Sequence, residues 1–132
     1  MADETKKEEK EAGLAEILSA FPSAPSADTI EQWKVKHGEV YVSGFSETEL
    51  FVWRPLTRPE WIKLQMLAAT PEAQMDQFKF EEAICNTCVL WKSMERTWEQ
   101  SKAGTVSTLQ EQILQQSNFL TPQAAALFVQ KL

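Results

Sequence analysis

The chain has 132 residues, of which 43% are apolar and 24% charged, which suits one small domain with a core. A net charge of −6 argues against nucleic acid as the main partner, and two cysteines with one histidine exclude a four-ligand Cys/His zinc site. No run approaches the roughly 20 apolar residues of a membrane-spanning helix, and the charged start MADETKKEEK does not resemble a signal peptide. We therefore expect a soluble, intracellular protein with no membrane partner.

Residues 1–28 are predicted to form a charged arm, a short amphipathic helix and a Pro/Ser linker. Leu14, Ile17, Leu18 and Phe21 follow the spacing i, i+3, i+4, i+7, which indicates a helix over about residues 10–20. The prolines and serines of residues 22–27 end this helix. Two interpretations stay open, because such a helix either folds back onto its own domain or docks on another chain.

Residues 29–132 are predicted to form a single α+β domain that begins with a β-hairpin or small antiparallel meander. Apolar and polar residues alternate in two β-rich runs, at residues 39–43 and 50–54. The turn-rich stretch 44–49 separates these runs, as expected for a hairpin. Residues 30–36 also alternate, which predicts either a third strand or the entry to the first.

About four helices are expected after the hairpin. A capping box between Thr57 and Glu60 predicts a helix over residues 58–69, and the next start signal is Thr70-Pro71. Residues 78–91 are the most apolar helical stretch and are predicted to be the core helix, followed by a loop at 92–104. Another capping-box pattern at 107–110 predicts a helix to about residue 117. A last short helix begins at Thr121-Pro122 and carries Leu127, Phe128 and Leu132.

Few residues suit catalysis. Cys85 and Cys88 have C-x-x-C spacing, but they lie inside an apolar helix and not at a helix start, so a structural role is favoured over a redox or metal role. His37 is expected in a surface loop, and the carboxylate pairs 47/49 and 81/82 on solvated faces. We therefore predict a non-enzymatic protein with no catalytic, cofactor-binding or metal-binding residues.

The aromatic residues are more informative. Five tryptophans are many for a chain of this length, and either all five belong to the core or some of them face a partner. Arg54 lies beside Trp53, and it is expected either to pair with Glu60 or Glu49 or to contact a partner. The residues predicted to bind a partner are Leu14, Ile17, Leu18, Phe21, Trp33, Trp53, Arg54, Arg58 and Trp98.

Three stretches in a fixed order resemble a known class of protein. Phe51–Trp61 resembles the pattern F-x-[WF]-R-P-L-[TS]-R-x-E-[WY], and Glu82–Trp91 resembles E-x-[IV]-x-x-x-C-[VL]-L-[WY]-P without its final proline, since Lys92 follows. Ala103–Phe119 resembles A-G-x-x-x-[TL]-L-x-x-x-I-[LM]-x-x-S-G-F, with Asn118 in place of the glycine. Over about residues 38–119, this order is similar to that of small tail proteins of long-tailed bacteriophages.

The resemblance implies a protein of tail morphogenesis. As a tail assembly chaperone, the chain would hold apolar helices of the tape-measure protein before the tube forms around them. As a virion subunit, it would contact tube or baseplate-hub subunits. Either role implies other phage tail proteins as partners, and a location in the host cytoplasm during assembly, with the virion tail as the final location of a subunit.

The sequence is also compatible with two other classes of protein. A generic soluble adaptor or inhibitor domain would be a stable monomer that binds one protein partner. An enzyme would need a functional His37, Cys85 or carboxylate pair, and alanine substitutions there would then abolish activity without unfolding the chain.

Overall fold

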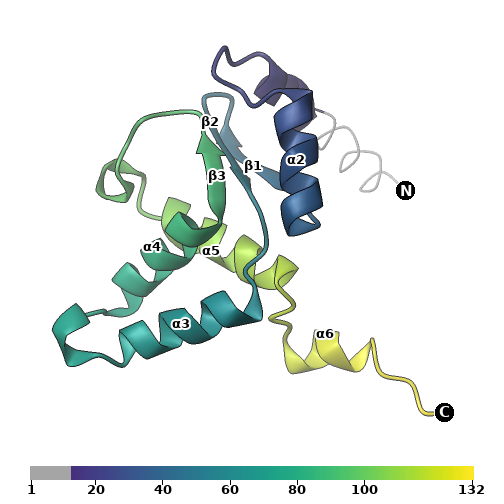
Figure 1. The fold of residues 1–132 in the computed structure, drawn as a ribbon, viewed down its shortest axis with the longest axis vertical. Coiled ribbons are helices and arrows are strands. Elements are labelled where there is room, and N and C mark those ends of the chain that lie inside the picture. The colour runs from purple at the N-terminus through teal and green to yellow at the C-terminus, as the bar shows by residue number, and fades with distance from the viewer. Residues whose placement is uncertain (1–12) are drawn as a thin grey trace.

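The computed structural model describes residues 13–132, which form a small α+β domain (Figure 1). Residues 13–19 are helical. The elements that follow are α2 (Ala27–His37), β1 (Tyr41–Ser46), β2 (Glu49–Trp53), α3 (Arg58–Ala68), the 3-10 turn η1 (Pro71–Ala73), α4 (Gln77–Cys88), β3 (Val89–Lys92), the 3-10 turn η2 (Trp98–Gln100), α5 (Thr105–Gln116) and α6 (Pro122–Ala126). The α+β class predicted from the sequence is confirmed.

The sheet has three antiparallel strands in the order β1-β2-β3, so the predicted antiparallel sheet is present. Strands β1 and β2 make the expected hairpin, in which Val42 pairs with Val52 and Gly44 pairs with Leu50. The third strand is not the one suggested by the alternation at residues 30–36. The third strand is β3, which follows α4 directly and pairs with the edge of β2 opposite to β1.

Residues 30–36 belong to the helix α2. Ser26 caps this helix, because its Oγ accepts a hydrogen bond from the backbone N–H of Thr29 at 3.1 Å. Asp28 lies in the first turn and basic residues lie in the last, which suits the helix dipole. Gly38 ends the helix with φ of 86°, a left-handed conformation that glycine adopts without strain.

The main core lies on one face of the sheet. Phe51 and Trp53 of β2 pack there against α4 and α5, with Leu64 of α3 and Leu56 at the edge. Helix α4 contributes Ile84, Cys85 and Cys88, and helix α5 contributes Leu109 and Ile113. The indole Nε1 of Trp53 donates to the Ser43 hydroxyl at 2.8 Å, and that hydroxyl donates to the side-chain oxygen of Gln112 at 2.6 Å. This chain of bonds satisfies the buried indole and ties both strands of the hairpin to α5.

Residues 13–21 contact the sheet at Gly44 and Trp91. Leu50 and Val52 are buried although their side chains point away from the main core. Leu14 packs beside Gly44 on this face, and the ring of Phe21 meets the edge of Trp91 with 5.8 Å between centroids. The helix therefore folds back onto its own domain, which is one of the two interpretations left open by the sequence.

Substitution of Gly44 tests the contact between Leu14 and the sheet. A Cβ added at Gly44 would lie 2.5 Å from Cδ2 of Leu14, so Gly44→Ala forces that side chain to move. We expect a loss of about 1 kcal/mol in the free energy of unfolding, measured by urea denaturation. Leu14→Ala removes the clash, so the double variant should be more stable than the sum of the two single losses predicts. Strictly additive losses would contradict the contact.

Two helix boundaries differ from the sequence prediction. Helix α4 ends at Cys88 and not at Trp91, because Val89 turns to an extended conformation and pairs with Trp53. Helix α5 begins at Thr105, two residues before the expected capping box. The Ser107 hydroxyl instead donates to Glu81 at 2.7 Å, and Thr105 is buried and donates to Glu49 at 3.3 Å. Glu49 is therefore buried, against the expectation of a solvated face.

The C-terminal helix is shorter than predicted. Thr121 caps it as expected, with its Oγ1 accepting from the backbone N–H of Ala124 at 3.2 Å. However, α6 ends at Ala126, so Leu127, Phe128 and Leu132 lie beyond it. Figure 1 shows this part of the chain running away from the rest of the domain.

Candidate protein-interaction surface

The first component of the candidate surface is the contact between Trp61 and Phe119. Trp61 lies in the first turn of α3, where the predicted capping box is present: Thr57 Oγ1 accepts from the Glu60 backbone N–H, and the Glu60 carboxylate accepts from the Thr57 backbone N–H at 3.0 Å. The ring of Trp61 lies 4.6 Å from that of Phe119, centroid to centroid. Trp61 is half-buried, whereas Phe119 stays 43% exposed.

Phe119 is held in place by the end of α5. Asn118 adopts a left-handed φ of 69°, which turns the chain back at the helix end, and the Phe119 N–H donates to Leu114 O at 3.0 Å. The Ser117 hydroxyl accepts from the Leu56 backbone N–H at 2.8 Å and donates to Ile113 O at 2.6 Å. The turn that carries Phe119 is therefore fixed both to α5 and to the segment before α3.

Two hollows lie on either side of Phe119, and together we call them the Phe119 groove. One has a volume of about 230 Å³ and is bounded by the start of α3 and the end of α5, with Arg58 at its rim. The other has a volume of about 420 Å³ and lies between α5 and the start of α6; its lining residues are Glu111, Leu114, Gln115, Phe119, Leu120, Thr121 and Ala124. The larger hollow thus combines an apolar wall with one acidic side chain.

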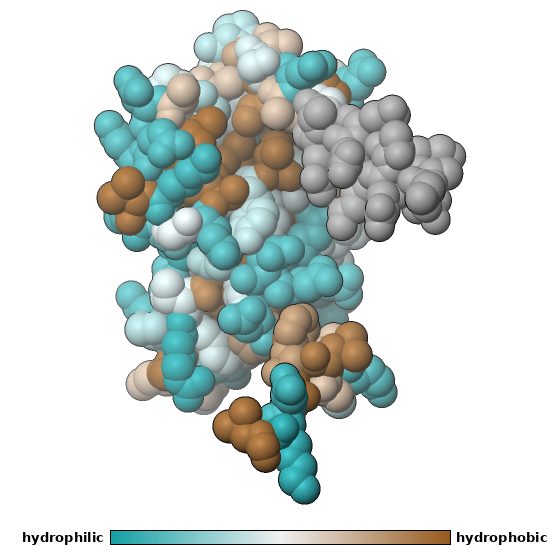
Figure 2. Space-filling model, turned by 90° about the vertical axis from the view of Figure 1, so that its right-hand side faces the viewer, coloured by the Kyte–Doolittle hydropathy of each residue, from teal (hydrophilic) through white to brown (hydrophobic). Residues whose placement is uncertain are grey.

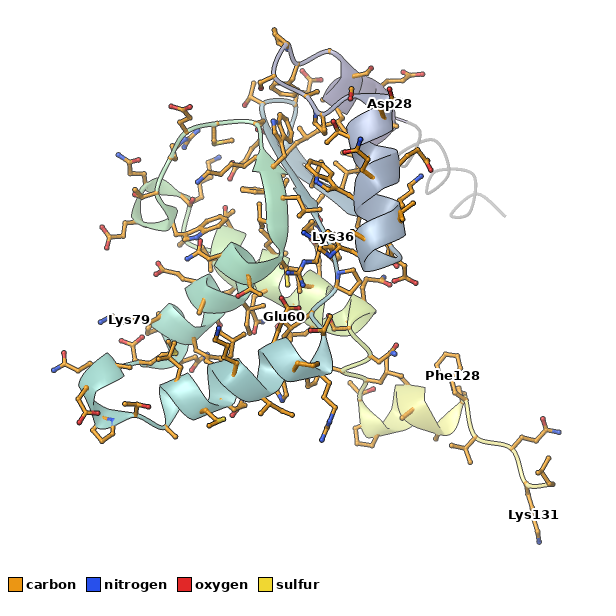
Figure 3. All side chains as sticks on the ribbon, in the orientation of Figure 1. Asp28, Lys36, Glu60, Lys79, Phe128 and Lys131 are labelled. Carbon is orange, nitrogen blue, oxygen red and sulfur yellow. The ribbon has the colours of Figure 1, made fainter. Side chains whose placement is uncertain are left out.

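The second component is the C-terminal segment, residues 127–132. Leu127, Phe128 and Val129 are 83%, 79% and 78% exposed, and Leu132 is fully exposed. Figure 2 shows hydrophobic residues gathered at the lower end of the molecule, and Figure 3 shows Phe128 and Lys131 directed away from the body. Four large apolar side chains in six residues form a patch of the kind that marks an interaction site.

Sequence reasoning did not select these residues. The sequence predicted that a last short helix carries Leu127, Phe128 and Leu132, and Phe119 entered only as the end of a motif. A signal was nevertheless present, because Lys131 is the only charged residue after Glu111. Such a long uncharged stretch is unusual in a chain whose charged fraction is 24%.

All but one of the residues predicted from the sequence to bind a partner lie outside the Phe119 groove. Leu14, Ile17, Leu18 and Phe21 are half-buried in or just after the N-terminal helix, and Trp33 is half-buried in α2. Trp98 is also half-buried, with its ring 5.7 Å from Phe51 and its Nε1 donating to Asn86 at 2.7 Å. Of the nine predicted residues, only Arg58 is exposed, and it alone lines the Phe119 groove.

Trp53 and Arg54 lie in the interior, so they are not part of the described surface. Trp53 is 3% exposed, and the Arg54 guanidinium makes a two-bond ion pair with Glu60, with a 2.7 Å bond from Nη2. The guanidinium also donates to Thr87 O at 3.0 Å and Pro55 O at 3.1 Å, while its Nε has no hydrogen-bond partner in residues 13–132. The structural ion pair, one of the two interpretations of Arg54, is the one observed.

The ion pair changes the titration of Glu60. The Arg54 guanidinium, helped by the N–H and hydroxyl of Thr57, lowers the pKa of the Glu60 carboxyl from 4.5 to about 2. Partial burial opposes this shift but does not overcome it. Figure 3 places Glu60 at the centre of the domain, near the start of α3. The pair therefore joins β2, α3 and the end of α4.

The two cysteines are free and fully buried in α4. Burial raises the pKa of both thiols from 9.0 to about 12, so the reactive thiolate is scarce at neutral pH. We expect iodoacetamide to leave both thiols unmodified in the folded protein and to alkylate both after unfolding in urea, as read by intact mass. Modification of either thiol at the rate of a free cysteine, without denaturant, would contradict this prediction.

Within residues 13–132, no three His, Cys, Asp or Glu side chains come together as a metal site would require. None of the helices in the same range is long and apolar enough to cross a membrane. His37 is partly buried, and burial together with the nearby Arg54 and Lys36 charges lowers its pKa below 6.5.

The chain was compared with protein-family profiles, with curated proteins and with solved structures, and none of them matches it. The candidate surface therefore has to be interpreted from its own residues: an apolar groove around Phe119, with one acidic side chain, and an exposed apolar segment beside it.

Proposed function

We propose that this chain is a non-enzymatic bacteriophage tail protein that acts through protein–protein contacts in tail or baseplate assembly. The observation that carries the proposal is the exposed apolar C-terminal segment beside the Phe119 groove. A patch of this kind is suited to another protein chain, because its side chains leave water when a partner covers them. The assignment to a phage tail, as distinct from another protein assembly, rests on the resemblance over residues 38–119.

The three stretches that carry the resemblance have structural roles. Phe51–Trp61 covers most of β2, the Arg54–Glu60 pair and the start of α3, and Glu82–Trp91 covers the end of α4 and most of β3. Ala103–Phe119 contains α5 and the turn that presents Phe119. The motifs therefore define the body of the domain and one wall of the groove, while the C-terminal segment lies outside them.

Two roles fit this surface. A chaperone for the tape-measure protein would cover that protein's apolar helices with the groove and release them when the tube forms. A virion subunit would keep the same contacts with tube or baseplate-hub subunits in the finished tail. The net charge of −6 favours solubility in the host cytoplasm in either case.

Quantitative mass spectrometry of purified phage particles and of infected-cell lysate tests the proposal. A fixed, near-integer copy number in particles would assign a virion subunit. Abundance in lysate with absence from particles would assign a chaperone. Absence of the chain from both samples would refute the proposal and leave the alternative, a soluble adaptor or inhibitor domain with one protein partner.

A further inference from the structure

The C-terminal segment is directed away from the groove of its own chain. The larger hollow is bordered by Thr121 and Ala124, at the start and middle of α6, whereas residues 127–132 leave from the other end of this helix. The backbone N–H groups of Leu127, Phe128 and Val129 donate to the carbonyls of Ala124, Ala125 and Ala126 at 3.2, 3.1 and 3.4 Å, respectively. These bonds continue the direction of α6 into the segment, as Figure 1 shows.

The groove and the segment complement each other in polarity. The larger hollow has a volume of about 420 Å³, and apolar atoms of Leu114, Phe119 and Leu120 form much of its wall. The segment offers apolar side chains of similar kind, led by Leu127 and Phe128. Both surfaces are open to solvent within the described chain, so each is available to the other in a second copy.

The charges also match. Among residues 13–132, Glu111 is the only charged residue that lines the larger hollow, and Lys131 is the only charged residue of the segment. Two copies that each carry −6 repel one another over most of their surfaces. A contact made by an uncharged stretch with one lysine, placed against a hollow with one glutamate, avoids that repulsion and adds one opposite-charge pair.

From these observations we infer that the larger hollow of the Phe119 groove binds residues 127–132 of a second copy of the chain. Leu127 and Phe128 enter the apolar part of the hollow, and Lys131 lies against Glu111. Because segment and groove flank the same short helix, two copies can exchange segments about a two-fold axis, which closes the assembly as a dimer. The inference goes beyond the proposed function, since it concerns the purified chain whether or not that chain belongs to a phage.

Sedimentation velocity of the purified full chain, over a series of protein concentrations, tests this inference. We expect a monomer–dimer equilibrium. The double variant Leu127→Ser/Phe128→Ser should weaken association at least tenfold, and Leu120→Glu in the groove should do the same. Val35→Ser changes an 87% exposed residue of α2 and should leave association unchanged, which controls for the loss of any exposed apolar side chain.

Two further experiments distinguish the segment–groove contact from other forms of self-association: mixing two variants, and exchanging the charges of Lys131 and Glu111. A mixture of the segment double variant with Leu120→Glu restores one intact segment–groove contact, so heterodimers should form where neither variant dimerises alone. Lys131→Glu and Glu111→Lys should each weaken the dimer about two- to fivefold, and the double exchange should restore it. The inference is overturned if the chain is monomeric at every concentration, or if it dimerises equally well with these substitutions. Neither result would alter the particle and lysate measurement that tests the phage proposal.

Discussion

Replacing Arg54 with alanine should lower the free energy of unfolding by about 3 kcal/mol, because it removes one partner of a largely buried ion pair. The Arg54 side chain is 10% exposed and that of Glu60 is 29% exposed, so the carboxylate left behind is only partly solvated. The substitution also removes the hydrogen bonds to Thr87 O and Pro55 O. Urea denaturation at neutral pH measures the loss.

The same pair gives the protein a specific dependence on acid. The pKa of Glu60 is about 2 in the folded protein against 4.5 for the free side chain, so the folded state favours the charged carboxylate. This stabilisation is present above pH 4.5 and is lost as the pH falls from about 4.5 towards 2. At 1.36 kcal/mol for each pKa unit, it amounts to on the order of 3 kcal/mol.

Glu60→Gln isolates this contribution from that of other carboxyl groups. The difference in unfolding free energy between the wild type and this variant should be largest near neutral pH and should shrink between about pH 4.5 and pH 2. Arg58→Ala is the matched control for Arg54→Ala, because Arg58 is exposed and makes no ion pair among residues 13–132. A loss at Arg58 as large as that at Arg54, or a pH-independent difference for Glu60→Gln, would contradict the role of the pair.

The second large loss of stability is expected when Ile113 is replaced. This residue of α5 is completely buried in the main core, beside Leu109 and the side chains of α4. Ile113→Ala removes three carbon atoms and leaves a cavity, so we expect a loss of about 3–4 kcal/mol in the free energy of unfolding. Urea denaturation measures this loss as a shift of the unfolding midpoint, with the dependence of the free energy on urea concentration unchanged.

Ile62→Ala provides the matched control. Ile62 lies on α3 and is 44% exposed, so the same chemical change there leaves no enclosed cavity, and alanine favours the helix. The loss at Ile62 should stay below about 1 kcal/mol. Equal losses at the two sites would show that α5 does not pack in the core as described.

The sequence predicted the elements whose signals are local. Thr57 and Glu60 form the expected capping box, and the β1–β2 hairpin lies where the alternation ended in a turn-rich stretch. Helix α2 also has local signals, namely the Ser26 cap and Gly38 at its end, but the alternation of residues 30–36 is typical of a strand. Because α2 has no buried residue, its apolar pattern at helical spacing is weak and does not outweigh the alternation.

Other features depend on contacts between distant segments. Strand β3 continues the apolar run of α4, and only its pairing with β2 determines that the chain becomes extended at Val89. Leu14 of the N-terminal helix packs beside Gly44 of the sheet, yet nothing in the spacing of the helix distinguishes its own sheet from a partner's surface. The Phe119 groove likewise requires α3, α5 and α6 to meet. For this reason the candidate surface could not be located from the sequence.

Site-specific photo-cross-linking during infection tests most directly whether this surface serves tail assembly. Beyond any cross-link to a second copy of the chain, a photoreactive residue at Phe128 should yield cross-links to an identified tail protein, whereas the same residue at the similarly exposed Val35 should not. Cross-links from position 128 to a tail tube, baseplate-hub or tape-measure protein are the predicted result. If position 128 yields no tail-protein cross-link above the level seen at position 35, the C-terminal segment is not the assembly contact, and the account is contradicted.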